Sequence, residues 1–194
     1  MIASNRKNIN QQTIEKPIVI SGIGLHSGSR VSIELEEAPE DNGIKFIRTD
    51  KKTKNIIDAI WSNVTSTTLS TTISNSEVDV STIEHLMSAL SGLHIDNLNI
   101  YISASEVPIM DGSSEPFVKL IEQNGIKVQN KRRKVLKVKK EIFVSNDKGS
   151  VKLIPNNQFS IDFEIDFPSS VVSKQSCQLQ LVNGNYKTDV ASAR

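Results

Sequence analysis

Apolar and polar side chains alternate along several short segments in the first half of the chain. In residues 31–36, Val31, Ile33 and Leu35 occupy every second position, with Ser and Glu between them. This period of two is typical of a strand with one buried face. Comparable apolar or β-branched runs, bounded by turn residues, predict further strands over residues 17–20, 44–48, 61–73 and 98–102.

A different spacing marks two helices. The first ends at the stop signal Gly92, and its apolar positions follow the i, i+3, i+4, i+7 pattern of one helix face: Ile83, Leu86, Met87 and Leu90. The second is predicted from about Glu115 to Asn124, with a proline in its first turn and a glycine directly after it. Its apolar stripe consists of Phe117, Leu120 and Ile121.

Strands followed by helix, strand and helix indicate an α+β fold, a layered sheet/helix sandwich, for residues 1–130. Residues 131–140 then carry seven Lys and Arg side chains in ten positions. Such a run can mark a nuclear or nucleic-acid segment, but Leu136 and Val138 alternate with lysines. That alternation favours a linker running into a strand with one solvent-exposed face. We therefore place the domain boundary near residue 130.

Residues 131–194 resemble an incomplete start of a second α+β domain. Apolar residues occupy every second position from Phe159 to Phe167, which is the clearest strand pattern in the chain. Turn signals at residues 146–149, 156–157 and 183–184 indicate hairpins between about four strands. Because no helix pattern accompanies them, the sequence predicts a sheet with an uncovered apolar face.

Composition narrows the class of protein. The chain has 194 residues, 37% of them hydrophobic, and a formal net charge of +1, so its charge favours neither nucleic acid nor a membrane surface as partner. A single cysteine excludes a disulfide framework and favours a reducing compartment. Residues 1–16 lack the apolar core of a signal peptide, and no apolar run reaches the length of a membrane span. We therefore expect a soluble, cytoplasmic protein without membrane insertion.

Glu84 and His85 carry the clearest chemical signal, because they lie side by side in the first turn of the predicted helix. A carboxylate beside an imidazole suits metal-assisted hydrolysis, in which the imidazole binds the ion and the carboxylate takes the proton of its water. The same residues fit a structural alternative, because Ser81-x-x-Glu84 is a capping box. The helix face behind the apolar stripe is small and uncharged, which suggests a neighbouring layer of structure. Both interpretations remain open.

Other candidates for a site are few. The chain has three histidines and no H-x-x-E-H, H-E-x-x-H or H-x-x-x-D pair, so its residues do not complete a metal site. His26 lies in a glycine-rich loop and is as compatible with a pocket as with a turn. His94 follows the helix stop, where a turn role is favoured. Cys177 is interpreted as a small core residue, and Asp111 is the one acid-base candidate in the loop at residues 108–114.

Several of these pieces together resemble one family, the UDP-3-O-acyl-N-acetylglucosamine deacetylases of lipid A synthesis. The resemblance covers essentially the whole chain, but only about the first two-thirds of the family's length. The matching segments, in order, are residues 21–28 (SGIGLHSG), 67–73 (TTLSTTI), 81–86 (STIEHL), 92–97 (GLHIDN) and 107–113 (VPIMDGS), with the strand at 159–167 and the terminal Ser192-Ala193-Arg194.

The resemblance implies two α+β domains, each a sheet with two helices, whose helices meet in the middle. It implies that His85 is a zinc ligand and that Glu84 is the general base. The reaction would hydrolyse the N-acetyl group of a small-molecule substrate, an acylated UDP-N-acetylglucosamine. The residues at or near the substrate cleft would be His26, Thr67, Thr68 and Leu69.

By the same resemblance, the family's other zinc ligands, a His and an Asp in an H-x-x-x-D arrangement, and its general-acid His would lie beyond Arg194. The resemblance therefore implies a zinc-dependent amide hydrolase of lipid A biosynthesis whose second domain is truncated. The 194-residue chain alone is expected to be inactive. The alternative is a non-catalytic product, either a truncated remnant or a binding module.

Overall fold

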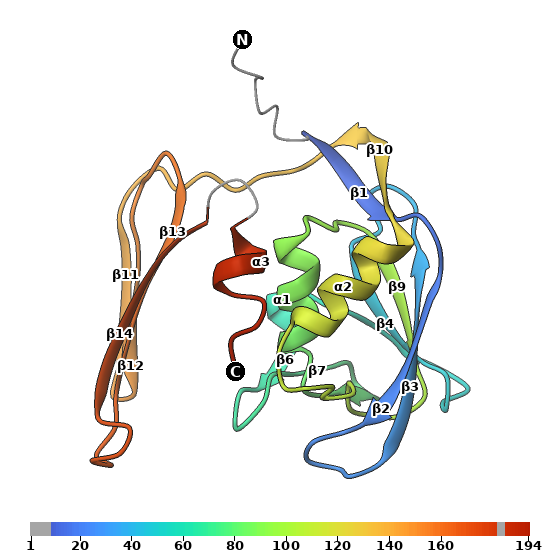
Figure 1. Ribbon diagram of the computed structural model, residues 1–194, viewed down its shortest axis with the longest axis horizontal. Helices are drawn as coiled ribbons and strands as arrows, with labels where there is room; N and C mark the ends of the chain where they lie inside the picture. Colours follow the sequence, from blue (N-terminus) through green and yellow to red (C-terminus); the bar gives the residue numbers. More distant parts are fainter. Residues whose placement is uncertain (1–8, 182–184) are drawn as a thin grey trace. The chain divides into compact units, whose positions relative to one another are not determined.

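In the computed structural model, which describes residues 9–181 and 185–194, the alternating segments of the first half form a five-stranded sheet (Figure 1). The strand order is β2-β3-β9-β4-β5, and all neighbours are antiparallel except the parallel pair β4 and β9. The strands are β2 (Ile18–Ile23), β3 (Arg30–Glu37), β4 (Ile44–Arg48), β5 (Ile56–Asp58) and β9 (Leu98–Ile102). The strands predicted over 17–20, 31–36, 44–48 and 98–102 are thus confirmed.

One face of this sheet is apolar because the register aligns the inward-facing side chains of neighbouring strands. Leu35 of β3 pairs with Ile100 of β9, which in turn pairs with Phe46 of β4. All three side chains are fully buried. The alternation visible in the sequence therefore corresponds to a continuous apolar layer across the sheet.

Helices α1 (Glu84–Gly92) and α2 (Glu115–Asn124) cover this layer (Figure 1). They contact each other, and α2 also contacts β2. Gly125 ends α2 with a φ of 93°, a left-handed backbone that favours glycine. Both predicted helices, and the α+β fold class, are confirmed. The buried helix residues are Leu86, Ala89 and Leu90 in α1 and Phe117, Val118 and Ile121 in α2.

Two strands lie in segments whose pattern does not predict them. β1 (Asn10–Ile14) pairs antiparallel with β10 (Ile126–Arg132). Gln11 of β1 is buried, and it accepts a 2.7 Å hydrogen bond from Asn97, which also donates to Gln129 of β10 at 2.7 Å. A partly buried amide network replaces apolar side chains here, so the period of two is absent from the sequence.

The prediction of strands throughout residues 61–73 is only partly right. The segment contains a short 3-10 helix (Trp61–Asn63), then β6 (Val64–Ser66) and the beginning of β7 (Thr72–Ser74). With β8 (Asp79–Val80) these strands form a separate three-stranded sheet. Residues 67–71 connect β6 to β7 as a loop.

Four further strands form two antiparallel hairpins. β11 (Ile142–Asn146) pairs with β12 (Gly149–Leu153), and β13 (Phe159–Asp166) pairs with β14 (Lys174–Leu181). The turn signal at 146–149 is confirmed, whereas 156–157 lies between β12 and β13, which do not pair among the described residues. The third signal, at 183–184, lies outside the described residues.

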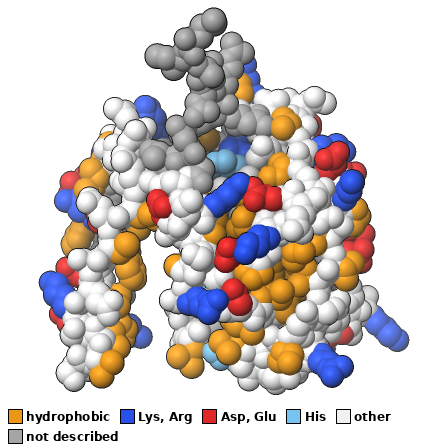
Figure 2. Space-filling view, viewed as in Figure 1, with side chains coloured by type: hydrophobic (Ala, Val, Ile, Leu, Met, Phe, Trp, Pro, Cys, Tyr) orange, Lys and Arg blue, Asp and Glu red, His pale blue; other side chains and the backbone are white. Residues whose placement is uncertain are grey.

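Both hairpins expose apolar side chains. Phe159 and Phe163 of β13 are 63% and 60% exposed, and Phe143 of β11 is 60% exposed. Figure 2 shows hydrophobic side chains at the surface along these hairpins. No helix occurs among residues 134–181, in agreement with the uncovered face expected from the sequence.

The chain divides into two compact units. One extends to Arg133 and also includes the final segment Lys187–Arg194, and the other is Lys134–Tyr186. The final segment joins the first unit through ion pairs of Lys187 with Glu122 and of Arg194 with Asp111. The sequence pattern assigns these last residues to the second segment instead. The short helix α3 (Tyr186–Asp189) lies where the units meet in sequence.

We predict that residues 1–130 fold on their own and that residues 134–194 do not. The first segment has two helices over its sheet, whereas the hairpins leave their apolar side chains in water, where they gain no burial free energy. Limited proteolysis with trypsin should leave a stable core that ends within the basic residues 131–140. A fragment containing β13 that persists as long as this core would contradict the prediction.

Candidate functional site

Glu84 and His85 occupy the first turn of α1, and both side chains are half-buried. The chain enters this turn through Thr82, which is buried and has a φ of 56°. A positive φ is a strained conformation for a β-branched residue, and it persists only where surrounding contacts hold it. The start of α1 is therefore fixed by its contacts rather than by helix propensity.

The capping box, one of the two interpretations left open by the sequence, is not formed at this helix start, so that alternative is wrong. The N-cap position is Ile83, and no side chain caps the helix. The amide of Ser81 donates to the carbonyl of Ser105 at 2.8 Å, and its hydroxyl donates to the same oxygen at 3.2 Å. Because Ser81 is engaged with this neighbouring segment, Glu84 has no cap amide to accept from.

The carboxylate of Glu84 instead accepts a hydrogen bond from the backbone amide of Thr71, with 3.0 Å between Thr71 N and Glu84 Oε2. Its other oxygen accepts none from the residues that the structure describes. The contact brings the loop at 67–71 to the start of α1. In this loop Leu69 has a φ of 61° and a side chain that is 86% exposed, and Thr67 and Thr68 are also exposed.

His26 lies in the tight loop between β2 and β3. The loop closes through a 3.0 Å hydrogen bond from the Gly28 amide to the Gly24 carbonyl, and Gly28 has a φ of 63°. The imidazole is exposed, while the backbone amide of His26 donates to Glu106 Oε1 at 2.9 Å. The glycines thus serve the turn, and they leave the imidazole at the surface.

Glu106 is a residue of this region that sequence reasoning missed. Its side chain is 2% exposed, and its carboxylate accepts hydrogen bonds from the His26 amide, the Ser27 amide and the Thr82 hydroxyl at 2.8 to 3.0 Å. Burial alone would raise its pKa, but these bonds, with one from the Ser27 side chain, hold the pKa of Glu106 at about 2. No periodicity or motif spacing in the sequence marks a single Glu in a loop as buried.

His94 forms a turn after α1, as the sequence predicts. It has a φ of 62°, and its carbonyl accepts from Gln12 Nε2 at 2.9 Å and from Arg133 at 2.7 Å. Arg133 also forms a two-fold ion pair with Asp96, at 2.7 and 2.8 Å. The motif around His94 therefore connects the end of α1 to Arg133, the residue that follows β10.

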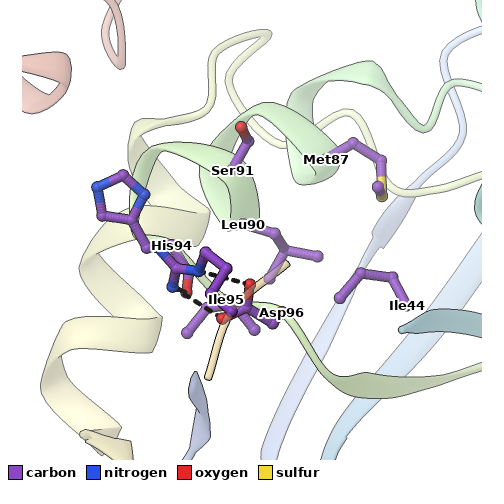
Figure 3. Close-up of a pocket in the computed structure, with 8 residues that line it drawn as sticks. Ile44, Met87, Leu90, Ser91, His94, Ile95 and Asp96 are labelled. Carbon is purple, nitrogen blue, oxygen red and sulfur yellow. Dashed lines mark hydrogen bonds and ion pairs between the residues drawn. The ribbon is translucent and has the colours of Figure 1, made fainter. Parts of the chain in front are cut away.

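A pocket of about 280 Å³ lies at this end of α1 (Figure 3). Ile44 and Met87 lie on one side of the pocket. His94 lies on the other side, and its imidazole points away from them (Figure 3). Glu84 and His85 do not line this pocket, which therefore belongs to the opposite end of the helix from the candidate pair. The lining residues are Ile44, Met87, Leu90, Ser91, His94, Ile95, Asp96 and Arg133.

Asp111 serves the loop that precedes α2. Its Oδ1 accepts from the amide and the hydroxyl of Ser113 at 2.9 and 2.8 Å, and Arg194 lies 3.2 Å from its Oδ2. The hydrogen bonds from Ser113, with the charge of Arg194, lower the pKa of Asp111. Cys177, expected to be a core residue, is exposed on β14. That expectation is wrong.

A metal site is incomplete among the residues that the structure describes. They contain no group of three or more His, Cys, Asp and Glu side chains placed to hold an ion. A catalytic zinc normally takes three protein ligands. The donors present therefore do not fit a zinc centre by themselves, and His85 is at most one ligand of such a set.

None of the described helices is long and apolar enough to cross a membrane.

Known proteins similar to this chain belong to one family. The profile of the UDP-3-O-acyl N-acetylglycosamine deacetylase family matches residues 11–194. A UDP-3-O-acyl-N-acetylglucosamine deacetylase of Syntrophus aciditrophicus is 40% identical over 184 residues, which cover 95% of this chain and 58% of the relative. Relatives of the same name from Syntrophotalea carbinolica and Chromohalobacter salexigens are each 43% identical, with 96% of this chain and 60% and 62% of their own lengths covered. The chain thus spans about three-fifths of the length of these relatives.

Proposed function

Because the chain belongs to the UDP-3-O-acyl N-acetylglycosamine deacetylase family, we propose that it forms the first part of a hydrolase that removes the N-acetyl group from UDP-3-O-acyl-N-acetylglucosamine in lipid A biosynthesis. Water would replace the amide nitrogen at the acetyl carbon, which releases acetate and a free amine. The single cysteine agrees with a cytoplasmic location.

The position of Glu84 carries this proposal. Its carboxylate is half-buried next to His85, and one oxygen is held by the Thr71 amide at 3.0 Å. A carboxylate oriented through one oxygen can accept a proton through the other, as a general base requires. We assign Glu84 as the base that takes the proton of the attacking water.

His85 is proposed as one ligand of a zinc ion. Zinc would supply Lewis-acid polarisation of the carbonyl when bound. The described residues contain no complete set of ligands, so the remaining ligands would have to come from residues other than these.

The substrate would lie over the loops that surround the start of α1. Thr67, Thr68 and Leu69 belong to the loop whose Thr71 amide contacts Glu84. Leu69 has an exposed apolar side chain and a positive φ, and non-glycine residues in this backbone region cluster at active sites and ligand contacts. His26 is connected to the same region through Glu106 and Thr82.

We expect the 194-residue chain by itself to release no acetate from UDP-3-O-acyl-N-acetylglucosamine. An ion held by a single imidazole keeps most of its waters, and their pKa stays near the aqueous value of about 9 rather than falling toward 7. Acetate release should be measured with the purified chain, with zinc added and with a chelator as control. Turnover above the chelated control would contradict this expectation.

A polypeptide that continues this chain through the rest of the family's length provides the test of the function itself. It should release acetate in a reaction that a chelator stops. A folded, family-length polypeptide without any acetate release would favour the alternative, a non-catalytic binding module.

A further inference from the structure

Three segments that are far apart in the sequence meet at the carboxylate of Glu106. The segment before α1 runs beside Glu106, because Ser81 forms a parallel bridge with it and the Val107 amide donates to the Ser81 carbonyl at 3.1 Å. The loop of His26 contributes its backbone amides to the same carboxylate. The three segments are thus connected through one buried side chain.

We propose that Glu106 is a positioning residue that couples the His26 loop to the first turn of α1. Its Oε1 accepts from both sides of this junction, from the His26 amide at 2.9 Å and from the Thr82 hydroxyl at 3.0 Å. Its Oε2 accepts from the Ser27 amide at 2.8 Å. A movement of the carboxylate therefore affects both segments at once.

The bond to Thr82 is the one that reaches Glu84. Thr82 has a φ of 56° and lies two residues before Glu84 in the chain. A β-branched residue keeps this conformation only under restraint, and the hydrogen bond from its hydroxyl to Glu106 provides one. The direction in which α1 begins, and hence the position of Glu84 against the Thr71 amide, depends on this restraint.

The contacts around Glu106 require a carboxylate at position 106 and a glycine at position 24. All the groups around Glu106 that bond to it are donors, and an ionised carboxylate is an acceptor only, so a Gln would present a donor amide to other donors. At Gly24, an added Cβ would lie 2.4 Å from Glu106 Oε2. The carboxylate therefore lies directly against the loop backbone.

The importance of this coupling for catalysis rests on the proposed function, but the coupling itself does not. It is measurable in the 194-residue chain by amide hydrogen exchange. The amides of His26 and Ser27 report on the His26 loop, because they donate directly to Glu106. The Thr71 amide reports on the first turn of α1, because it donates to Glu84 and not to Glu106.

In Glu106→Gln, we expect exchange at His26, Ser27 and Thr71 to rise by about tenfold or more, because a charge-assisted bond is lost while the fold remains. Thr82→Val, which removes the hydroxyl and keeps the side-chain shape, should also speed exchange at Thr71. Thr82→Ser keeps the hydroxyl and is the matched control, with little change. The Ile100 amide in the central strand β9 monitors global stability.

Faster exchange at His26 and Ser27 with no change at Thr71 would overturn the proposal, because Glu106 would then hold only its own loop. Unchanged exchange at all three amides would overturn it as well. Glu106→Gln can destabilise the whole fold, which would appear as faster exchange at the Ile100 amide. In that case the two Thr82 variants provide the test, and equal Thr71 exchange in Thr82→Val and Thr82→Ser refutes the coupling. None of these outcomes depends on acetate release, so a failure here is distinct from a failure of the proposed function.

Discussion

Glu84→Gln should lower the rate of acetate release by ~10²–10⁴-fold and leave the bound metal unchanged, because it removes a general base that is not a metal ligand. The measurement belongs in a polypeptide that carries this chain and the rest of the family's length. Turnover, metal content and melting temperature should be recorded for each variant. This prediction has the largest effect that we expect from a single substitution.

The contact with Thr71 allows a structural role of Glu84 to be distinguished from a catalytic one. A Gln at position 84 retains an oxygen that can accept from the Thr71 amide, whereas Glu84→Ala removes that acceptor. A purely structural role predicts that Gln restores what Ala loses, at a cost of about 1 kcal/mol for Ala. A catalytic role predicts that both variants are equally slow, while only Ala is less stable.

His85→Ala is the matched comparison at the neighbouring position. If His85 is a zinc ligand, its removal lowers metal affinity and activity together, in contrast to Glu84→Gln. A Glu84→Gln protein with normal turnover and reduced stability would refute the assignment of the base. A His85→Ala protein that retains its metal and its activity would refute the assignment of the ligand.

The parts of the fold that the sequence predicts are those in which burial is apolar and periodic. The alternation in β3 and β9 reflects one sheet face covered by helices, and the helical spacing in α1 and α2 reflects the other side of the same interface. β1 and β10 escape prediction because Asn97, which is buried, donates hydrogen bonds to the buried Gln11 and to the half-buried Gln129. Periodicity in hydrophobicity carries no information about such a network.

The candidate site likewise contains residues that the sequence identifies and residues that it does not. Glu84 and His85 are neighbours in the chain, so the sequence alone is sufficient to identify the pair. The capping box is a local rule that a non-local contact overrides, because the amide of Ser81 donates to Ser105. Glu106 cannot be found from sequence, since its donors at His26 and Ser27 are 80 and 79 residues away and are backbone groups.

A pH titration of stability should show the ionisation of Glu106 as a loss of about 3 kcal/mol on acidification, the second large effect that we expect. The pKa of this carboxyl falls from a usual value of 4.5 to about 2 in the folded chain, against the effect of burial, because amides and hydroxyls of His26, Ser27 and Thr82 bond to the charged form. A folded pKa below the unfolded one means that the stabilisation is complete above about pH 4.5 and is lost as the pH falls toward 2. Urea denaturation at pH 7 and at intervals down to pH 2 measures it.

Glu106→Gln should remove this part of the pH dependence, since Gln has no proton to gain. The comparison is between the two slopes, because other carboxyls such as Asp111 titrate equally in both proteins. Glu77→Gln is a suitable control, because Glu77 forms an exposed ion pair with Lys54, and such pairs contribute ~0–1 kcal/mol. Wild-type and Glu106→Gln proteins that lose stability in parallel between pH 5 and pH 2 would show that the buried carboxylate is not held in its charged form by the His26 loop and Thr82.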